Sequence, residues 1–90
     1  MESLLIMNNN IELHNISENI ELDFLKPNES GRIKEIKGGH TASKRLFELG
    51  LNRGSEVKMM KNDFGPVILY LSGHKLALGR GLAHKVIVER

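Results

Sequence analysis

The fold is decided by residues 44–57, which read Lys44-Arg45-Leu46-Phe47-Glu48-Leu49-Gly50-Leu51-Asn52-Arg53-Gly54-Ser55-Glu56-Val57. Ala42, Leu46 and Leu49 recur at the i, i+4, i+7 spacing that places side chains on one face of an α-helix. Gly50 is the residue best able to take the left-handed conformation that ends a helix, and Leu51 can then fold back onto Leu46 in a Schellman-type closure. The pattern therefore predicts a helix that ends at Gly50.

Turn residues and β-branched side chains mark the segment before this helix. Lys26-Pro27-Asn28-Glu29 predicts a turn, because proline presets φ at the first central position and asparagine tolerates a positive φ at the second. Residues 31–36 predict a strand with a bend or bulge near its end, since its two isoleucines would face opposite sides of a regular strand. Gly38-Gly39-His40 ends that strand, and Thr41 or Ser43 is expected to cap the helix.

Four strand-like runs follow a turn at Asn52-Arg53-Gly54. They are Glu56–Lys61, Val67–Leu71, Lys75–Leu78 and Lys85–Glu89. Asn62–Pro66 predicts a loop, Gly73-His74 a two-residue hairpin turn with glycine first, and Gly79–Ala83 one tight helical turn. With residues 31–36 this makes five strands and one short α-helix between the first two. The prediction is a mainly β fold, a small β-barrel, because closing the sheet removes exposed edges.

The predicted domain spans residues 22–90, and residues 1–21 form an N-terminal extension in which neither helical nor strand periodicity persists. A chain of 90 residues has the size of one domain. We expect aliphatic side chains from the helix and the strands to fill the barrel. The predicted core consists of Ile33, Leu46, Leu49, Val57, Met59, Val67, Leu69, Leu71, Leu76, Leu78 and Ile87.

Composition is typical of a folded globular protein, with 40% apolar and 27% charged residues. No apolar run approaches the ~20 residues of a membrane-spanning helix, and the longest, Leu4-Leu5-Ile6-Met7, lacks a basic leader and a cleavage site. The absence of cysteine excludes disulfides and thiolate metal sites. We expect a soluble protein of the cytoplasm that is not embedded in a membrane.

Catalysis and nucleic-acid binding both lack a sequence signal. No hydrolase elbow, phosphate-cradling loop or paired-carboxylate motif occurs, and Gly79-Arg80-Gly81 lacks the third glycine and the acidic residue of a dinucleotide-binding fingerprint. The net charge is +2, the basic residues are dispersed, and aromatic residues make up only 4% of the chain. We expect no enzymatic activity and no nucleic-acid partner, although a small nucleic-acid-binding barrel stays an alternative.

Histidines are the only nitrogen ligands that the sequence offers to a metal ion. They are His14, His40, His74 and His84, and none lies at the i, i+4 spacing that presents two imidazoles on one helical face. His40 beside the helix start and His74 at the hairpin tip are the candidate ligands, which Glu48 or Asp63 would complete only if the fold brings them close. The alternative is that both histidines are solvent-facing loop residues. We expect no required cofactor.

Three basic residues and one aromatic residue are candidates for contact with a partner. Lys44, Arg45 and Arg53 flank the helix and its exit turn, where they can meet an acidic surface. The alternative is a solvated helix face. Phe64 lies in the predicted loop before Gly65-Pro66, where it can anchor an interface or cover one end of the barrel.

Four segments of the chain together resemble a known family. They are Leu25-Lys26-Pro27, Lys44 to Leu51, Gly54-Ser55-Glu56-Val57 and Leu76-Ala77-Leu78. They resemble the FeoA family of ferrous-iron transport accessory proteins over residues 22–89. The specific part is the central block, a basic pair followed by Leu, one residue, Glu-Leu-Gly-Leu, two residues and Gly. Arg53 departs from the family pattern, which commonly has proline there.

The resemblance implies an SH3-like barrel that works in the cytoplasm beside FeoB, the membrane permease with a GTP-binding domain. The implied role is regulation or assembly. Our leading hypothesis is that the helix surface around Lys44, Arg45 and Arg53 docks on the cytoplasmic part of this permease. A second hypothesis is a metal-sensing module that binds ferrous or another divalent ion through His40, His74 or nearby carboxylates. Calorimetric titration with divalent ions separates the two hypotheses.

Overall fold

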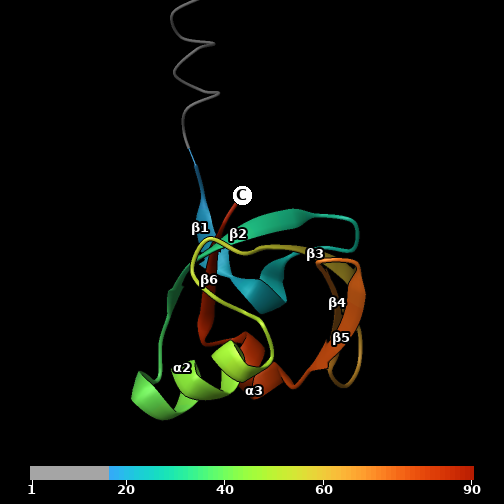
Figure 1. Cartoon of the computed structure of the whole chain (residues 1–90). Coiled ribbons are helices and arrows are strands. Elements are labelled where there is room, and N and C mark those ends of the chain that lie inside the picture. Colours follow the sequence, from blue (N-terminus) through green and yellow to red (C-terminus); the bar gives the residue numbers. More distant parts are fainter. Residues whose placement is uncertain (1–16) are drawn as a thin grey trace, which may run out of the picture.

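The computed structural model describes residues 17–90, which form one curled antiparallel sheet with two short helices at one end (Figure 1). The strands are β1 (Asn19–Glu21), β2 (Ser30–Ile36), β3 (Glu56–Lys61), β4 (Val67–Leu71), β5 (His74–Leu78) and β6 (Val86–Glu89). The helical elements are the 3-10 turn η1 (Leu22–Phe24), α2 (Gly39–Glu48) and α3 (Arg80–Ala83). Hydrogen bonds join the strands in the order β1-β6-β2-β3-β4-β5.

All five predicted strands are present, and α2 lies between the first two of them, as predicted. The added strand β1 uses residues 19–21 of the extension and pairs with β6, with Ile20 opposite Val88. The sheet begins at β1 and ends at β5. In the part of the chain that the structure describes these two strands are therefore edges, and β1 and β5 do not pair with each other to close the barrel completely. Residues 1–16, which include His14, lie outside the described part of the chain.

The segment before α2 follows the prediction closely. Asn28 has a φ of 73°, and the Glu29 N–H closes the turn by donating to the carbonyl oxygen three residues earlier at 2.9 Å. The pairing of β2 with β6 shifts register between Ile33 and Glu35, which is the predicted bulge. Ile33 stays buried before the bulge, and Ile36 lies beside α2 after it.

The start of α2 corrects the prediction of a side-chain cap. The helix begins directly after Gly38, whose φ is 92°, and neither Thr41 nor Ser43 caps it, because both lie inside the helix. A tertiary contact sets this early start: the Lys37 N–H donates to the Lys85 carbonyl oxygen at 2.7 Å. A Cβ at Gly38 would meet the Lys85 Cδ atom at 2.8 Å, so glycine allows the close approach.

The end of α2 confirms the predicted Schellman closure. The Gly50 N–H donates to the Phe47 carbonyl oxygen and the Leu51 N–H to the Leu46 carbonyl oxygen, both at 2.9 Å. Gly50 has a φ of 90°, and Leu46 and Leu51 are both fully buried. The leucine beyond the helix therefore enters the core together with the leucine of its last turn.

The hairpin between β4 and β5 turns one residue earlier than predicted. Leu71 pairs with His74, so the two turn residues are Ser72 and Gly73. Both have a positive φ, 49° and 85°, which is the signature of a type I′ turn rather than of a turn with glycine first. His74 is consequently the first residue of β5.

The core lies between the sheet and the helices, and most predicted members belong to it. The buried cluster contains Leu22, Leu25, Ile33, Leu46, Leu51, Val57, Met59, Val67, Leu69, Leu78, Ala83, Val86 and Val88. Leu71 and Leu76 are only partly buried, and Leu49 is wrong as a core residue because 39% of it is exposed. Ile87 is also wrong, since β6 turns its two flanking valines inward.

Candidate functional site

The outer side of α2 carries the two basic residues predicted for partner contact. Ala42 and Leu46 of the helix are buried, whereas Lys44 and Arg45 are exposed and line a shallow hollow with His40, Thr41 and Glu48. Within residues 17–90 neither basic side chain belongs to an ion pair. The structure thus leaves both charges available to an external partner.

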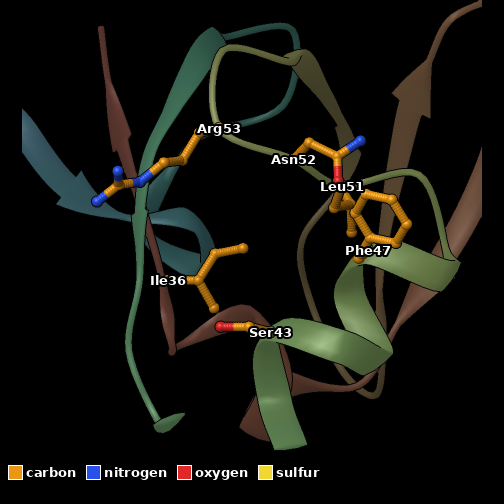
Figure 2. A pocket seen from close by; sticks show the side chains of 6 residues that line it. All are labelled: Ile36, Ser43, Phe47, Leu51, Asn52 and Arg53. Carbon is orange, nitrogen blue, oxygen red and sulfur yellow. The ribbon is translucent and has the colours of Figure 1, made fainter. Parts of the chain in front are cut away.

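A cavity of about 310 Å³ lies on the other flank of α2, between the helix, the end of β2 and the loop that follows α2 (Figure 2). Its lining consists of Ile36, Ser43, Phe47, Leu51, Asn52 and Arg53. Figure 2 shows Phe47 and Arg53 at opposite rims with Ile36 between them. Phe47 is 67% exposed, so a large aromatic ring borders the cavity without being packed into the core.

Backbone hydrogen bonds hold the loop that carries Arg53 against β2. The Gly54 N–H donates to the Ile33 carbonyl oxygen at 2.7 Å, and the Ile33 N–H donates to the Ser55 carbonyl oxygen at 2.8 Å. The Asn52 N–H also donates to the Ser55 Oγ at 3.2 Å. Arg53 therefore projects from a fixed turn, and the cavity wall beside it is formed before any partner binds.

Lys44 joins the basic side of α2 to the flank that borders the cavity, whereas Arg45 lies on the opposite side of the helix from Phe47. Phe47 follows Lys44 by three residues and is therefore its neighbour on the helix. We call Lys44, Arg45, Phe47 and Arg53 the α2 surface. Sequence reasoning found its three basic members and missed Phe47, although an aromatic residue next to the buried Leu46, off the apolar face, was a usable signal.

Phe64 lies apart from the α2 surface, in the loop between β3 and β4. It is 95% exposed, so it does not cover the end of the barrel, and its role as a partner anchor stays a prediction. It lines neither the hollow with Lys44 nor the cavity with Arg53. The loop is held instead by Arg80, whose Nη2 donates to the Asp63 carbonyl oxygen.

The predicted metal ligands do not assemble into one site. His40 is on α2, whereas His74 lines a different pocket beside Leu49 and Leu76. Glu48 lines the same hollow as His40, but it lies eight residues farther along the helix, about 12 Å along the helix axis. No group of three His, Asp or Glu side chains gathers at ligand distance within residues 17–90.

A histidine and a carboxylate that sequence reasoning did not pair lie together near α3. The His84 Nδ1 is 3.2 Å from the Asp23 Oδ2, and the Phe24 ring stands edge-on to the imidazole with ring centroids 6.2 Å apart. The two residues are 61 positions apart, and only the packing of α3 on η1 joins them. No spacing rule could have found this pair.

Comparison with known proteins adds a family to this geometry. A family model described as the FeoA domain matches residues 20–90. The chain belongs to the FeoA family. A relative from Methanocaldococcus jannaschii, provisionally named Fe(2+) transport protein A, is 44% identical over 68 residues, which cover 76% of this chain and 83% of the relative. The resemblance seen in the sequence is confirmed, and the whole α2 surface lies inside the FeoA match.

Solved FeoA structures share the fold. A crystal structure of an iron uptake regulatory protein (FeoA) is similar with a TM-score of 0.76 and 31% identity, covering 81% of this chain and 99% of that one. FeoA of Stenotrophomonas maltophilia, complexed with zinc and described as an SH3 domain protein, gives a TM-score of 0.65 and 26% identity, covering 74% and 86%. The predicted SH3-like barrel is confirmed.

The longest helix of this FeoA-family chain that the structure describes is α2, with ten residues. No helix within residues 17–90 is long and apolar enough to cross a membrane.

Proposed function

We propose that this chain is a non-catalytic accessory protein of ferrous iron uptake, which docks in the cytoplasm on a FeoB-type permease with a GTP-binding domain and regulates transport. Membership of the FeoA family supports the link to ferrous iron. The observation that carries the docking proposal is the α2 surface. Lys44 and Arg45 have no ion-pair partner within residues 17–90, and Lys44 lies next to exposed Phe47, which borders a cavity.

Each part of the α2 surface has a distinct physical role in docking. Aromatic and arginine side chains are enriched at the energetic centres of interfaces, and burial of Phe47 against a partner would contribute about 1.5–3 kcal/mol. Lys44 and Arg45 would attract an acidic surface and raise the association rate, an effect that salt screens. The cavity beside Phe47 would accept a partner side chain without rearrangement of the loop, which its hydrogen bonds hold in place.

The test measures binding of the full chain to the purified cytoplasmic part of the permease by biolayer interferometry. We expect the double variant Lys44→Glu/Arg45→Glu to lower the association rate at least tenfold and to flatten its dependence on salt. Phe47→Ala should instead raise the dissociation rate, because it removes apolar burial and leaves the charge unchanged. Ferrous uptake by cells that carry each variant should fall in parallel.

The control is Lys26→Glu/Lys61→Glu, which changes the net charge by the same amount at two exposed positions off the α2 surface. This control should bind as the wild type does. If it weakens binding as much as the α2 variant, only net charge matters and the α2 surface is not the docking site. Unchanged binding and uptake in the α2 variant would refute the proposal outright.

The metal-sensing role stays a second prediction, and the FeoA complexed with zinc is a different protein. The positions of His40 and His74 in separate hollows favour independent behaviour of the two residues. Calorimetric titration of the full chain with ferrous ion tests the role. If each single variant, His40→Ala and His74→Ala, loses the heat of ferrous-ion binding, the two residues share one site. That result would favour the metal-sensing role.

A further inference from the structure

Strand β5 is an open edge of the sheet. Within the described residues it is hydrogen-bonded to β4 alone and ends the strand order. No backbone hydrogen bond outside this ladder involves residues 74–78 in the described part of the chain. Among residues 17–90, the N–H and C=O groups of β5 that point away from β4 therefore have no backbone partner. Such an edge is a template for the addition of another strand.

The inner side of this edge carries an apolar pocket. It has a volume of about 250 Å³, and its lining includes Leu49, Leu71, His74 and Leu76. Leu49 is the residue that was expected in the core and is 39% exposed. Leu49 and the pocket next to it therefore form an apolar area beside β5 that no other residue of the described chain covers.

The outer side of the same edge is basic and aromatic. The sheet register places Lys58, Tyr70 and Lys75 in one row across β3, β4 and β5. Side chains in such a row stand next to one another on one face. Tyr70 is 42% exposed, and neither lysine forms an ion pair within residues 17–90. The acidic residue nearest in the register, Glu56, lies opposite Arg32 on β2 and lines a hollow together with Lys58 and Tyr70, but not Lys75.

These two sides define the strand that the edge can accept. Side chains of an added strand alternate between the two faces of the sheet. On the outer face an acidic side chain would lie next to Lys75, and on the inner face an apolar side chain would enter the pocket beside Leu76. A second copy of the chain is a poorer occupant, because its own β5 edge would bring lysine and histidine against lysine and histidine.

We infer that β5 binds an extended segment of a partner protein in which acidic and apolar residues alternate, through main-chain pairing at the edge. This binding site is separate from the α2 surface and does not depend on the proposed docking there. Main-chain hydrogen bonds supply the affinity, and the pocket and the lysine row supply the selectivity.

The test uses the full chain and a fluorescein-labelled peptide of seven residues that alternates Glu and Val, with binding followed by fluorescence anisotropy. We expect saturable binding that weakens with salt. A peptide with the same side chains but N-methylated at alternate residues should bind at least tenfold more weakly, since it cannot donate main-chain hydrogen bonds to the edge. A Lys and Val peptide should not bind, because it meets Lys75 with like charge.

Variants of the protein locate the site and separate it from the α2 surface. Lys75→Glu should weaken binding of the acidic peptide at least fivefold, because it replaces an attractive cross-strand pair by a repulsive one. Lys26→Glu, with the same charge change elsewhere, should leave binding unchanged. The Lys44→Glu/Arg45→Glu variant should also keep it, so failure of the docking proposal and failure of this one are distinguishable.

Four results with the peptide would overturn the inference. They are absence of binding at millimolar peptide, equal binding of the N-methylated peptide, equal effects of the Lys75 and Lys26 variants, and peptide-induced amide NMR shifts confined to α2. A dimer in sedimentation experiments that Lys75→Glu alters would assign the edge to a second copy and would also overturn it.

Discussion

Replacement of Gly50 by alanine tests the link between the helix end and the α2 surface. Gly50 has a φ of 90°, and its N–H closes the Schellman turn that sends Leu51 into the core. An L side chain in this left-handed region costs about 1–2 kcal/mol. The added Cβ would lie 3.4 Å from the Leu71 Cδ2, which is ordinary contact, so no steric clash adds to that cost.

We therefore expect Gly50→Ala to lower the free energy of unfolding by about 1–2 kcal/mol. For a domain of this size, each kcal/mol corresponds to about 4–8 °C in Tm. The assay is urea denaturation followed by circular dichroism, in which the midpoint should fall while the slope m stays constant. Gly50→Asn should cost less, because asparagine tolerates the left-handed conformation.

The control for this prediction is Gly81→Ala in α3. Gly81 has no positive φ, and a Cβ there would meet no atom within 4 Å. Alanine is favoured over glycine in a helix by about 0.5–1 kcal/mol, so this variant should be more stable than the wild type. The two glycine substitutions should thus have opposite signs. A stabilised Gly50→Ala variant would refute the assignment of strain to the helix end.

Two further predictions concern the rest of the fold. Asn62→Ala should lower the free energy of unfolding by about 1–3 kcal/mol, because the Asn62 Nδ2 donates to the Asp23 and Leu25 carbonyl oxygens at 2.7 and 2.8 Å; an unchanged urea midpoint would contradict this. The hydrogen bond from Lys34 holds the pKa of the Glu89 carboxyl below its usual value. Its stabilising contribution is therefore complete above the unfolded-state pKa and is lost as the pH falls through the lower folded-state pKa. Urea midpoints measured against pH should show that acid-side loss in the wild type and a smaller one in Glu89→Gln, and identical profiles would contradict the assignment.

Local signals account for the parts of the fold that the sequence predicted well. Strands β3 and β4 were predicted with their observed bounds, because turns bound each run and valine or methionine marks the inward side. The end of α2 was equally predictable, since the chemistry of Gly50 and Leu51 lies within a few residues of the helix. In these segments the local preference and the tertiary packing agree.

The missed features depend on contacts between distant segments. β6 contains the run Val86-Ile87-Val88, in which no polar residue indicates which side is buried. The pairing of Val88 with Ile33 on β2 determines which side chains of β6 face the core. The start of α2 is set by the Lys85 carbonyl oxygen, which lies far along the chain. A sequence pattern cannot specify such choices because each alternative satisfies the local preferences equally well.

The candidate site was predictable in its charges and not in its shape. Lys44 and Arg45 stand out in the sequence, but the cavity beside Phe47 exists only because the bulge in β2 and the turn at Arg53 bring Ile36 close to α2. The unpaired edge of β5 was not predicted from the sequence. We expected a closed barrel because closure removes exposed edges, whereas the sheet leaves β5 open.

The C-terminal turn of α2 separates the two proposed binding surfaces. Phe47 and Leu51 line the cavity of the α2 surface, and Leu49 and Gly50 line the pocket at the β5 edge. The Schellman hydrogen bonds hold the backbone that positions both sets of lining residues, so we expect a change at Gly50 to displace both. Gly50→Ala should therefore weaken permease docking and acidic-peptide binding together, whereas Lys44→Glu/Arg45→Glu and Lys75→Glu should each affect only one. Loss of a single activity in Gly50→Ala would show that the helix end supports that surface alone.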